Sequence, residues 1–339
     1  MSVTIHQIAA QVGLSAKSVS RILSNENAPH RPETRERVLA VARELGYRAN
    51  GSARAMRSRR VGSVALLLST LGYRSVLPER LREGIQAALT ANRLHLLVAA
   101  LPDAQLTDEA YLPQVLREWA ADGLLINYNA DVPPGLPVLI ARHAIPAIWI
   151  NAKRDADCVH PDDFGCAHEA TERLIALGHA RIAYLDYAGV THYSAPDRLA
   201  GCRAALEAAG HAPPLVFNGG GDPATRAERA HVWLARPAGE RPTAMLVYGA
   251  GLAAPVLYAA AQLRLRVPSD LSLVTIEDAP DNSTGRTLDT MVLPEAAMGR
   301  AAVARLLEKI ADPTRLLPPL ALSAAYAPGT TCAPPPREP

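Results

Sequence analysis

Two basic side chains near the N-terminus, Lys17 and Arg21, have the type and spacing needed to recognise DNA bases. A separation of four residues places both on one face of a helix. Lysine or arginine bound to the O6 and N7 atoms of guanine is the commonest specific protein–DNA contact. The alternative is that both residues form only the solvated side of a surface helix. The elements around them have to decide between these interpretations.

Three short helices are predicted around this pair. Thr4 and Gln7 have the spacing of a capping box, Gly13 suits the end of the first helix, and Ser15 can cap a second one. Pro32 suits the first turn of a third helix. Two helices joined by a tight turn form a helix-turn-helix, whose second helix enters the major groove. The apolar residues at helical spacing are Ile5, Ile8, Ala9 and Val12, then Val19, Ile22 and Leu23, then Val38, Val41, Ala42 and Leu45.

The charge of the chain is unevenly distributed. Residues 1–60 contain 11 Lys/Arg and 4 Asp/Glu, a net charge of +7, whereas the whole chain of 339 residues contains 35 and 33. Residues 61–339 therefore contain 24 and 29, a net charge of −5. A basic head on a mildly acidic body is typical of a phosphate-binding module attached to a domain of another kind. Charge and helix pattern together favour DNA recognition over a merely solvated surface.

The composition predicts a cytoplasmic globular protein. The chain is 49% apolar and 20% charged, and its length allows two or three folded units. It shows no secretory signal pattern, and no apolar run is long enough to span a membrane. The cysteines are widely spaced, which favours reduced structural thiols over a metal or redox site. They are Cys158, Cys166, Cys202 and Cys332.

Short apolar runs alternate with amphipathic stretches from residue 61 onward. This alternation predicts an α/β body with parallel sheets covered by helices on both faces. One barrel or two doubly wound halves would both satisfy the pattern. The expected strands are 62–69, 95–101, 123–127, 147–151, 181–186, 243–248 and 271–276. The expected helices are 78–92, 108–121, 165–177, 197–209, 225–236 and 253–263.

The head resembles the DNA-binding domain of the LacI/GalR transcriptional regulators. Residues 3–21 fit the pattern V-T-[IL]-x-x-[IV]-A-x-x-[AV]-G-[VL]-S-x-x-[ST]-V-S-R at nearly every fixed position, and residues 33–50 continue the likeness. The resemblance implies that Ala16, Lys17 and Arg21 contact bases and that Ser15 and Ser20 lie near phosphates. The loop 25–31 departs from the family, because it is one residue longer and contains Pro29-His30-Arg31.

Residues 50–60 form a short basic segment after the head. By itself the segment is too short to be a stable helix, so in the free protein it is expected to be a flexible linker. In the resembled family the same segment becomes a hinge helix on DNA, paired across a dimer in the minor groove. The resemblance implies that Ala53 approaches the groove floor, Arg54 binds a phosphate and Met56 is inserted between base steps.

The resemblance continues along the body to about residue 328. Residues 162–165 and 174–183 are similar to the family's D-N-x-x-G and H-L-x-x-x-G-H-x-x-I segments, 198–201 to R-x-x-G and 267–272 to V-P-x-D-x-S. It implies a periplasmic-binding-protein-like body of two doubly wound subdomains rather than a barrel. The implied domains are 1–49 (helix-turn-helix), 50–60 (hinge), 61–161 with 290–320 (N-subdomain), 162–289 with 321–330 (C-subdomain) and 331–339 (disordered proline-rich tail).

The resemblance also implies a small polar effector, a sugar or sugar derivative, in a cleft between the subdomains. Polar residues at the carboxyl ends of strands would hold it: Ser69, Tyr73, Asn127, Asn151, Arg198 and Glu277. Arg198 could bind two hydroxyls or a carboxylate through its planar fork, or it could form a structural salt bridge at the interface of the two halves. Gly249-Ala250 replaces the family's Asn-Asp pair, which leaves open a regulator with no effector.

No enzymatic or metal-binding motif stands out in the sequence. Residues 219–222 lack the spacing and lysine of a phosphate loop. A metal interpretation of His160, Asp162, Asp163, His168 and Glu169 is weaker than helix capping by the Asp pair. We therefore expect a cytoplasmic repressor, not an enzyme, with no cofactor, that binds a pseudo-palindromic operator as a homodimer. A solute-binding protein is the alternative from another class.

Overall fold

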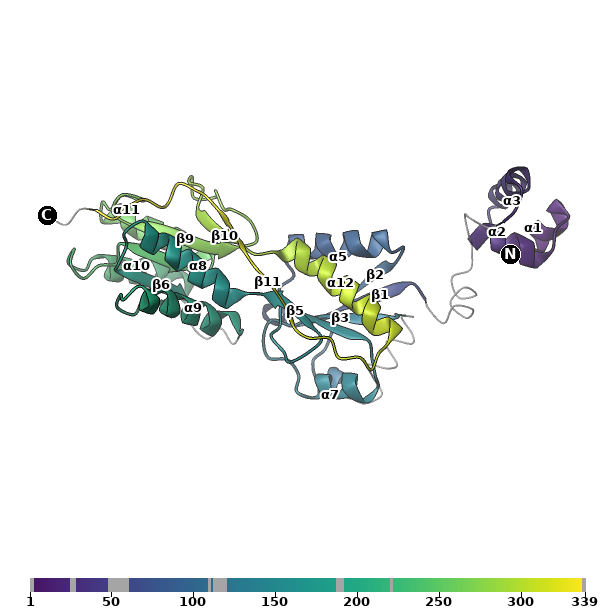
Figure 1. The fold of residues 1–339 in the computed structure, drawn as a ribbon, viewed down its shortest axis with the longest axis horizontal. Helices are drawn as coiled ribbons and strands as arrows, with labels where there is room; N and C mark the ends of the chain where they lie inside the picture. Colours follow the sequence, from purple (N-terminus) through teal and green to yellow (C-terminus); the bar gives the residue numbers. More distant parts are fainter. Residues whose placement is uncertain are drawn as a thin grey trace. The chain divides into compact units, whose positions relative to one another are not determined.

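The computed structural model describes residues 3–24, 29–47, 61–108, 111, 121–186, 192–219 and 222–336. The chain separates into two compact units, Met1–Val61 and Gly62–Pro339. Figure 1 shows the elements of each unit coloured along the sequence. The predicted hinge contacts Ala53, Arg54 and Met56 lie outside the described residues, as does the side chain of Tyr73.

The first unit consists of helices α1 (Ile5–Val12), α2 (Ala16–Ser24) and α3 (Pro32–Glu44). The predicted capping box is present, since Gln7 N–H donates to Thr4 Oγ1 and Thr4 N–H donates to Gln7 Oε1. Gly13 ends α1 in the left-handed region with φ 68°, which glycine adopts without strain. The three helices enclose a small core made of Ile8, Ala9, Val12, Val19, Ile22, Val38 and Ala42.

The second unit contains two lobes, each built on one six-stranded sheet. The first sheet has the order β11-β5-β4-β3-β1-β2, and its paired strands are all parallel. Helices α5 (Glu79–Ala91) and α12 (Glu295–Ala311) cover one face, and α7 (Gly135–Arg142) covers the other. Its strands are β1 (Ser63–Ser69), β2 (His95–Leu101), β3 (Gly123–Asn127), β4 (Ala147–Ile150), β5 (Cys158–Pro161) and β11 (Leu320–Leu322).

The second sheet has the order β12-β10-β9-β8-β6-β7, with only β12 antiparallel. Helices α8 (Asp163–Ala176) and α9 (Ser194–Ala208) cover one face, while α10 (Arg226–Leu234) and α11 (Ala250–Gln262) cover the other. The strands are β6 (Ile182–Asp186), β7 (Leu215–Asn218), β8 (Ala244–Val247), β9 (Ser272–Glu277), β10 (Asp289–Val292) and β12 (Ala325–Ala327). The two doubly wound halves are thus confirmed, and the barrel is excluded.

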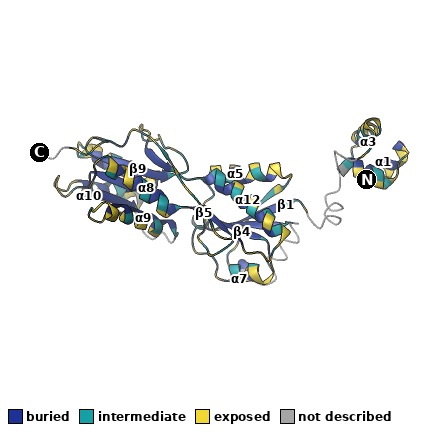
Figure 2. Cartoon of the chain, viewed as in Figure 1, coloured by how far each residue is buried: buried dark blue, intermediate teal, exposed yellow. Residues whose placement is uncertain are grey.

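The central strands are buried on both faces, as the uniformly apolar runs predicted. Every residue of β3, β4 and β8 is buried. Figure 2 shows β4 in dark blue and the surrounding helices partly exposed. Three short 3-10 turns also occur in this unit, at Gly72–Arg74 (η1), Gln105–Thr107 (η2) and Pro223–Thr225 (η3).

The chain passes between the lobes three times, after β5, after β10 and after β11. Two predicted boundaries need correction. Residues 290–292 belong to the second sheet, because β10 pairs with β9 as far as Val292. Residues 321–322 belong to the first sheet, because β11 pairs with β5 as far as Leu322. Hydrophobic pattern alone could not place these crossovers, since both strands lie at sheet positions fixed by partners remote in sequence.

The prediction that the chain is disordered from residue 331 onward is wrong for residues 331–336. Thr331 is fully buried, and its hydroxyl donates to Leu273 O at 2.8 Å while its N–H donates to Asp289 Oδ2 at 2.7 Å. Ala333 N–H donates to Ser272 Oγ at 3.0 Å. Proline-rich composition suggested disorder, but these bonds from the ends of β9 and β10 hold the segment against the second sheet.

Candidate DNA-reading helix and effector site

Helix α2 separates its side chains into a buried and an exposed face. Val19 and Ile22 are 0% and 1% exposed, whereas Lys17 and Arg21 lie on the surface. Ala16 and Ser20 are half-buried between the two faces. Because α2 contains no acidic residue, the face that carries Lys17 and Arg21 is purely basic. This is the arrangement that the sequence predicted for a helix in the major groove.

One hydrogen bond caps α2, and another joins α3 to the end of α1. Ser18 N–H donates to Ser15 Oγ at 3.1 Å, so Ser15 caps α2 as predicted. Arg37 of α3 donates to Val12 O at 3.1 Å and satisfies the last turn of α1. The sequence reasoning missed this role of Arg37, because only the tertiary packing brings α3 to the end of α1. Helix α2 is therefore capped at its start and packs on a small core shared with α1 and α3, which are joined by the Arg37 hydrogen bond.

The carboxyl ends of the first sheet carry a polar network centred on Asp103. Its carboxylate accepts from Ser69 Oγ at 2.7 Å and Tyr128 OH at 2.8 Å, and it pairs with Arg74 at 2.5 Å. Burial by itself would raise the pKa of Asp103, but these hydrogen bonds and the Arg74 charge together lower it. Sequence reasoning found Ser69 but missed Asp103 and Arg74, which follow strand ends just as the predicted residues do.

Asn127 and Asn151 occupy the ends of β3 and β4, as the sequence predicted. Asn127 is fully buried, and its Nδ2 donates to Val76 O at 2.8 Å, whereas its Oδ1 has no partner among the described residues. Asn151 has φ 52°, a left-handed conformation that asparagine tolerates better than most residues. Its backbone oxygen accepts from His192 Nε2 at 2.9 Å, and this bond joins the two lobes.

Arg198 forms a buried ion pair within the second lobe. Its Nε lies 2.7 Å from Asp163 Oδ1, one of its terminal nitrogens donates to Tyr248 O at 2.9 Å, and the residue is only 5% exposed. Burial alone would lower the pKa of Arg198, but the Asp163 charge more than offsets this. Arg198 thus forms a structural salt bridge, but within the second lobe and not at the interface of the halves. Asp162 caps α8 by accepting from Gly165 N–H at 2.9 Å, as predicted.

A chain of hydrogen bonds continues from Tyr248 toward the first lobe. Tyr248 OH and Ser194 Oγ are 2.6 Å apart, and Ser194 Oγ lies 2.7 Å from His192 Nδ1. His192 in turn bonds Asn151 O. Burial lowers the pKa of His192, so the neutral ring is favoured. His192 and Tyr193 thus both contact Asn151, a predicted effector residue.

Glu277 ends β9 and replaces the missing polar cap of α11. Gly249, the N-cap of α11, has no side chain, and Glu277 Oε1 instead accepts from Ala250 N–H at 2.5 Å. Burial raises the pKa of Glu277, and this hydrogen bond opposes the shift. The substitution of Gly249-Ala250 for Asn-Asp is therefore compensated at the same strand edge by a carboxylate from the neighbouring strand.

Glu295 is a buried carboxyl group at this edge that the sequence reasoning missed. It is the first residue of α12, is 5% exposed, and its Oε2 has no partner among the described residues. Burial, with the charges of Asp278 and Glu277, raises the pKa of Glu295 to about 8. An acidic residue at the start of a helix normally indicates only a favourable interaction with the helix dipole, so the burial of Glu295 could not be predicted from its position.

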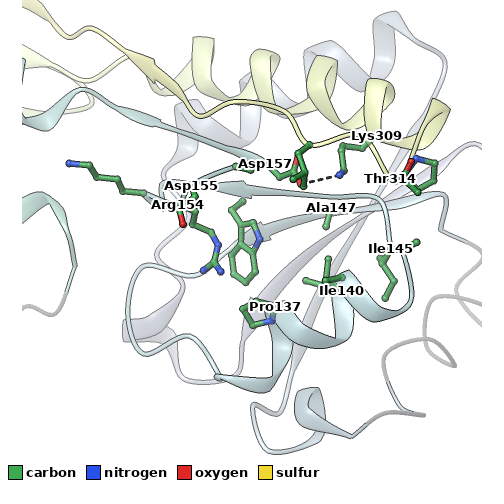
Figure 3. A pocket seen from close by; sticks show the side chains of 16 residues that line it. Pro137, Ile140, Ile145, Ala147, Arg154, Asp155, Asp157, Lys309 and Thr314 are labelled. Atoms are coloured by element: carbon green, nitrogen blue, oxygen red, sulfur yellow. Dashed lines mark hydrogen bonds and ion pairs between the residues drawn. The ribbon is translucent and has the colours of Figure 1, made fainter.

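A separate pocket of about 690 Å³ lies in the first lobe. Figure 3 shows it between α7 and the C-terminal part of α12, with Lys309 paired to Asp157 at its margin. Ala147, at the amino end of β4, lines it, and none of the six predicted effector residues does. Ligands of open α/β sheets bind at the carboxyl ends of strands. The pocket in Figure 3 is therefore not the predicted effector site.

Metal-binding clusters and membrane-spanning helices are both absent from the described residues. There, no group of three or more His, Cys, Asp or Glu side chains is placed to hold a metal ion. Within the same part of the chain, no helix combines the length and apolar character needed to cross a membrane.

Two family models match the chain. One, described as "Bacterial regulatory proteins, lacI family", matches residues 4–50, and one described as "Periplasmic binding protein-like domain" matches residues 171–332. The first match covers the whole helix-turn-helix that presents Lys17 and Arg21. The chain thus combines a LacI-family helix-turn-helix domain with a periplasmic-binding-protein-like domain. It is accordingly a DNA-binding transcriptional regulator.

Curated LacI-family relatives extend over most of the chain. Catabolite control protein A of Priestia megaterium is 25% identical over 313 residues, which cover 91% of this chain and 92% of the relative. The HTH-type transcriptional repressor PurR of Escherichia coli (strain SMS-3-5 / SECEC) is 27% identical over 316 residues, 91% of each chain. The HTH-type transcriptional regulator DegA of Bacillus subtilis (strain 168) is 26% identical over 285 residues, 82% of each chain.

Solved structures share the fold. The Lac repressor dimer bound to operator and the anti-inducer ONPF aligns with a TM-score of 0.78 and 24% identity, covering 98% of this chain and 100% of that one. A complex of the transcriptional regulator CelR with cellobiose aligns with a TM-score of 0.66 and 24% identity, covering 97% and 99%. At this identity the likeness concerns the fold, which is the predicted combination of helix-turn-helix and two-lobed α/β body.

Proposed function

We propose that this regulator represses transcription by binding a pseudo-palindromic operator as a homodimer. The observation that carries the proposal is the purely basic outer face of α2, with Lys17 and Arg21 exposed above a core of Val19 and Ile22. The two-fold symmetry of a dimer calls for two matched half-sites. Support comes from the relatives, which include a repressor, and from the likeness to a Lac repressor dimer bound to operator.

The proposed contacts divide by chemistry. Lys17 and Arg21 donate to guanine, and Ala16 contacts the base edges beside them. Ser15 and Ser20 bind phosphates, which fixes the position of α2 along the groove. In the hinge, Arg54 binds a phosphate, while Ala53 lies in the minor groove and Met56 is inserted between base steps.

We propose further that a small polar effector, a sugar or sugar derivative, controls operator binding. The proposed ligands are Ser69, Tyr73, Asn127, Asn151, Arg198 and Glu277, at the carboxyl ends of the two sheets. Effector binding would change the relative orientation of the lobes and thereby order or release the hinge. The lobe-spanning bonds Lys153–Asp197 at 2.6 Å and His192–Asn151 at 2.9 Å would respond to that movement. The likeness to a cellobiose-bound regulator supports a carbohydrate-like ligand.

We also propose that the protein acts in the cytoplasm, where the operator lies, and catalyses no reaction. The polar groups at the strand ends pair with one another instead of forming a nucleophile and base, within the described residues. A solute-binding protein would have no use for the basic helix-turn-helix.

The DNA-reading assignment is tested by binding titrations with Lys17→Ala and Arg21→Ala. Each change should cost about 1–3 kcal/mol on the preferred operator and relax the base preference at one position of each half-site. Arg43→Ala is the control, because it removes the same charge from the exposed surface of α3. We expect the control to lower affinity equally for all sequences, if at all. Unchanged affinity and selectivity in both α2 variants would refute the assignment.

A further inference from the structure

The strand-end edge of the second lobe has an excess of negative charge. Glu277, Asp278 and Glu295 meet there, and none of them has an ion pair with a described residue. The basic side chains that border the strand ends already have acidic partners. Those pairs are Arg74–Asp103, Lys153–Asp197 and Arg198–Asp163. The three carboxyl groups therefore have no basic partner among the described residues.

Backbone hydrogen bonds bring Glu277 and Glu295 close together. Glu277 lies opposite Val292 in the β9–β10 ladder, and Leu293 N–H donates to Glu277 O at 2.7 Å. Glu295 N–H then donates to Leu293 O at 2.9 Å. The two carboxyl groups thus start from neighbouring points, one at the end of β9 and one at the start of α12.

Glu295 is the group whose environment most requires a ligand. It is 95% buried, and its Oε2 has no hydrogen-bond partner among the described residues. An unpaired buried carboxylate is strongly destabilising, and the free protein meets this cost by favouring the protonated form. A bound cation would supply both the missing hydrogen bond and the missing charge.

The cation is an organic one. The three carboxyl groups are not gathered closely enough with others to form a metal site among the described residues. Asn127 Oδ1, fully buried at the end of β3, is a second acceptor without a described donor. A ligand that satisfies both Glu295 Oε2 and Asn127 Oδ1 must therefore carry hydrogen-bond donors besides its positive charge.

We propose that the effector is a polyhydroxylated amine, such as an amino sugar or amino alditol, whose ammonium group binds Glu295 and Glu277. The inference rests on the proposed effector control and names the chemical class of the ligand. Glu295 contributes the unpaired oxygen, Asp278 adds negative charge, and the hydroxyl groups reach acceptors such as Asn127. Arg198, being paired with Asp163, contributes structure rather than binding an anion.

The test measures binding to the full-length protein by calorimetry, with amines and their uncharged counterparts. Glucosamine, galactosamine, mannosamine and 1-amino-1-deoxysorbitol are compared with glucose, galactose, mannose, sorbitol and the N-acetyl sugars. We expect at least one amine to bind and its neutral counterparts to bind about tenfold to a hundredfold more weakly, the effect of a charge-assisted hydrogen bond. Glu295→Gln and Asp278→Asn should remove that preference, whereas Glu308→Gln, an exposed change on the same helix, should keep it.

A pH series separates a ligand-binding role of Glu295 from a structural one. The charged groups that face it are Glu277, Asp278 and Arg198. Because binding must remove the proton from Glu295, affinity for 1-amino-1-deoxysorbitol should rise about tenfold from pH 6 to pH 7. In Glu295→Gln the affinity should be flat over that range.

Three results would overturn the inference. A neutral sugar that binds as well as every amine would show an effector site of another chemistry and leave the proposed function intact. An amine preference that persists in both Glu295→Gln and Asp278→Asn would place the ammonium elsewhere. No binding by any compound, with specific operator binding retained, would refute the amine ligand and also effector control by this class of compounds, while the DNA-binding role would stand.

Discussion

Replacing Glu295 by Gln should make the protein relatively more stable as the pH rises. The pKa of Glu295 is raised from 4.5 to about 8 by burial and by the charges of Asp278 and Glu277. A carboxyl whose pKa is raised in the folded state stabilises the fold below its unfolded pKa. That contribution is lost as the pH rises through the folded value. The cost of ionising Glu295 in the folded protein therefore lowers the stability of the wild type progressively between pH 5 and pH 8.5.

The magnitude follows from the two pKa values. At about 1.4 kcal/mol per unit, a shift of roughly 3.5 units gives an upper limit of about 5 kcal/mol. About 1 kcal/mol of that is already present at pH 5, where the unfolded carboxyl is largely ionised. The amino end of α12 favours the carboxylate by about 0.5–1 kcal/mol. We therefore expect the free energy of unfolding of Glu295→Gln, relative to wild type, to increase by about 3 kcal/mol between pH 5 and pH 8.5.

Urea unfolding of both proteins at the two pH values measures this difference. The comparison across pH cancels the constant cost of placing an amide where a carboxyl was. Glu308→Gln, on the exposed part of the same helix, serves as the control and should show no such trend. If the stability difference between Glu295→Gln and wild type were the same at pH 5 and pH 8.5, the buried, unpaired carboxyl inferred here would be wrong.

Two further predictions concern the second lobe. Gly201→Ala should lower the free energy of unfolding by about 1–3 kcal/mol, because an added Cβ would clash with the backbone oxygen of Phe164 where α8 and α9 cross. The matched control is Gly239→Ala, an exposed position with open space where the Cβ would lie. Equal thermal unfolding midpoints of Gly201→Ala and wild type would contradict the close packing of α8 and α9. Thr331→Val should cost about 1–3 kcal/mol, since Asp289 N–H loses the buried hydroxyl oxygen to which it donates at 2.9 Å. The check is hydrogen exchange of the Asp289 N–H in the wild-type protein. If this N–H exchanged as fast as those at the chain ends, the segment 331–336 would not be held in place.

Much of the architecture was determined by local sequence. The capping box at Thr4, the glycine stop at Gly13 and the apolar spacing of α1 and α2 act within a few residues, and all were found as predicted. Strands β2 and β3 also have the predicted bounds. The run that forms β3 is apolar up to its last residue because the strand is buried on both faces. Elements with weaker local patterns, such as β5, β7 and β10, were missed, and so was the long α12 despite its buried apolar stripe.

The candidate effector site was predictable only in part. A polar residue after a buried strand can be recognised in the sequence, which is why Ser69, Asn127 and Glu277 could be named. The hydrogen-bond partner of each side chain could not be predicted from the sequence. Arg198 bonds Asp163, 35 positions away, and Glu277 bonds Ala250, 27 positions away. Such pairings depend on which strands are neighbours in the sheet.

The sequence by itself determined the exposed basic face of α2, because helix periodicity alone places Lys17 and Arg21 on the face opposite Val19 and Ile22. Only the tertiary structure decided the electrostatics of the strand ends. Burial and the approach of Asp278 and Glu277 change Glu295 from an ordinary helix-start residue into an unpaired carboxyl with a raised pKa. Desolvation depends on every atom that surrounds a group, and those atoms come from segments distant in the chain.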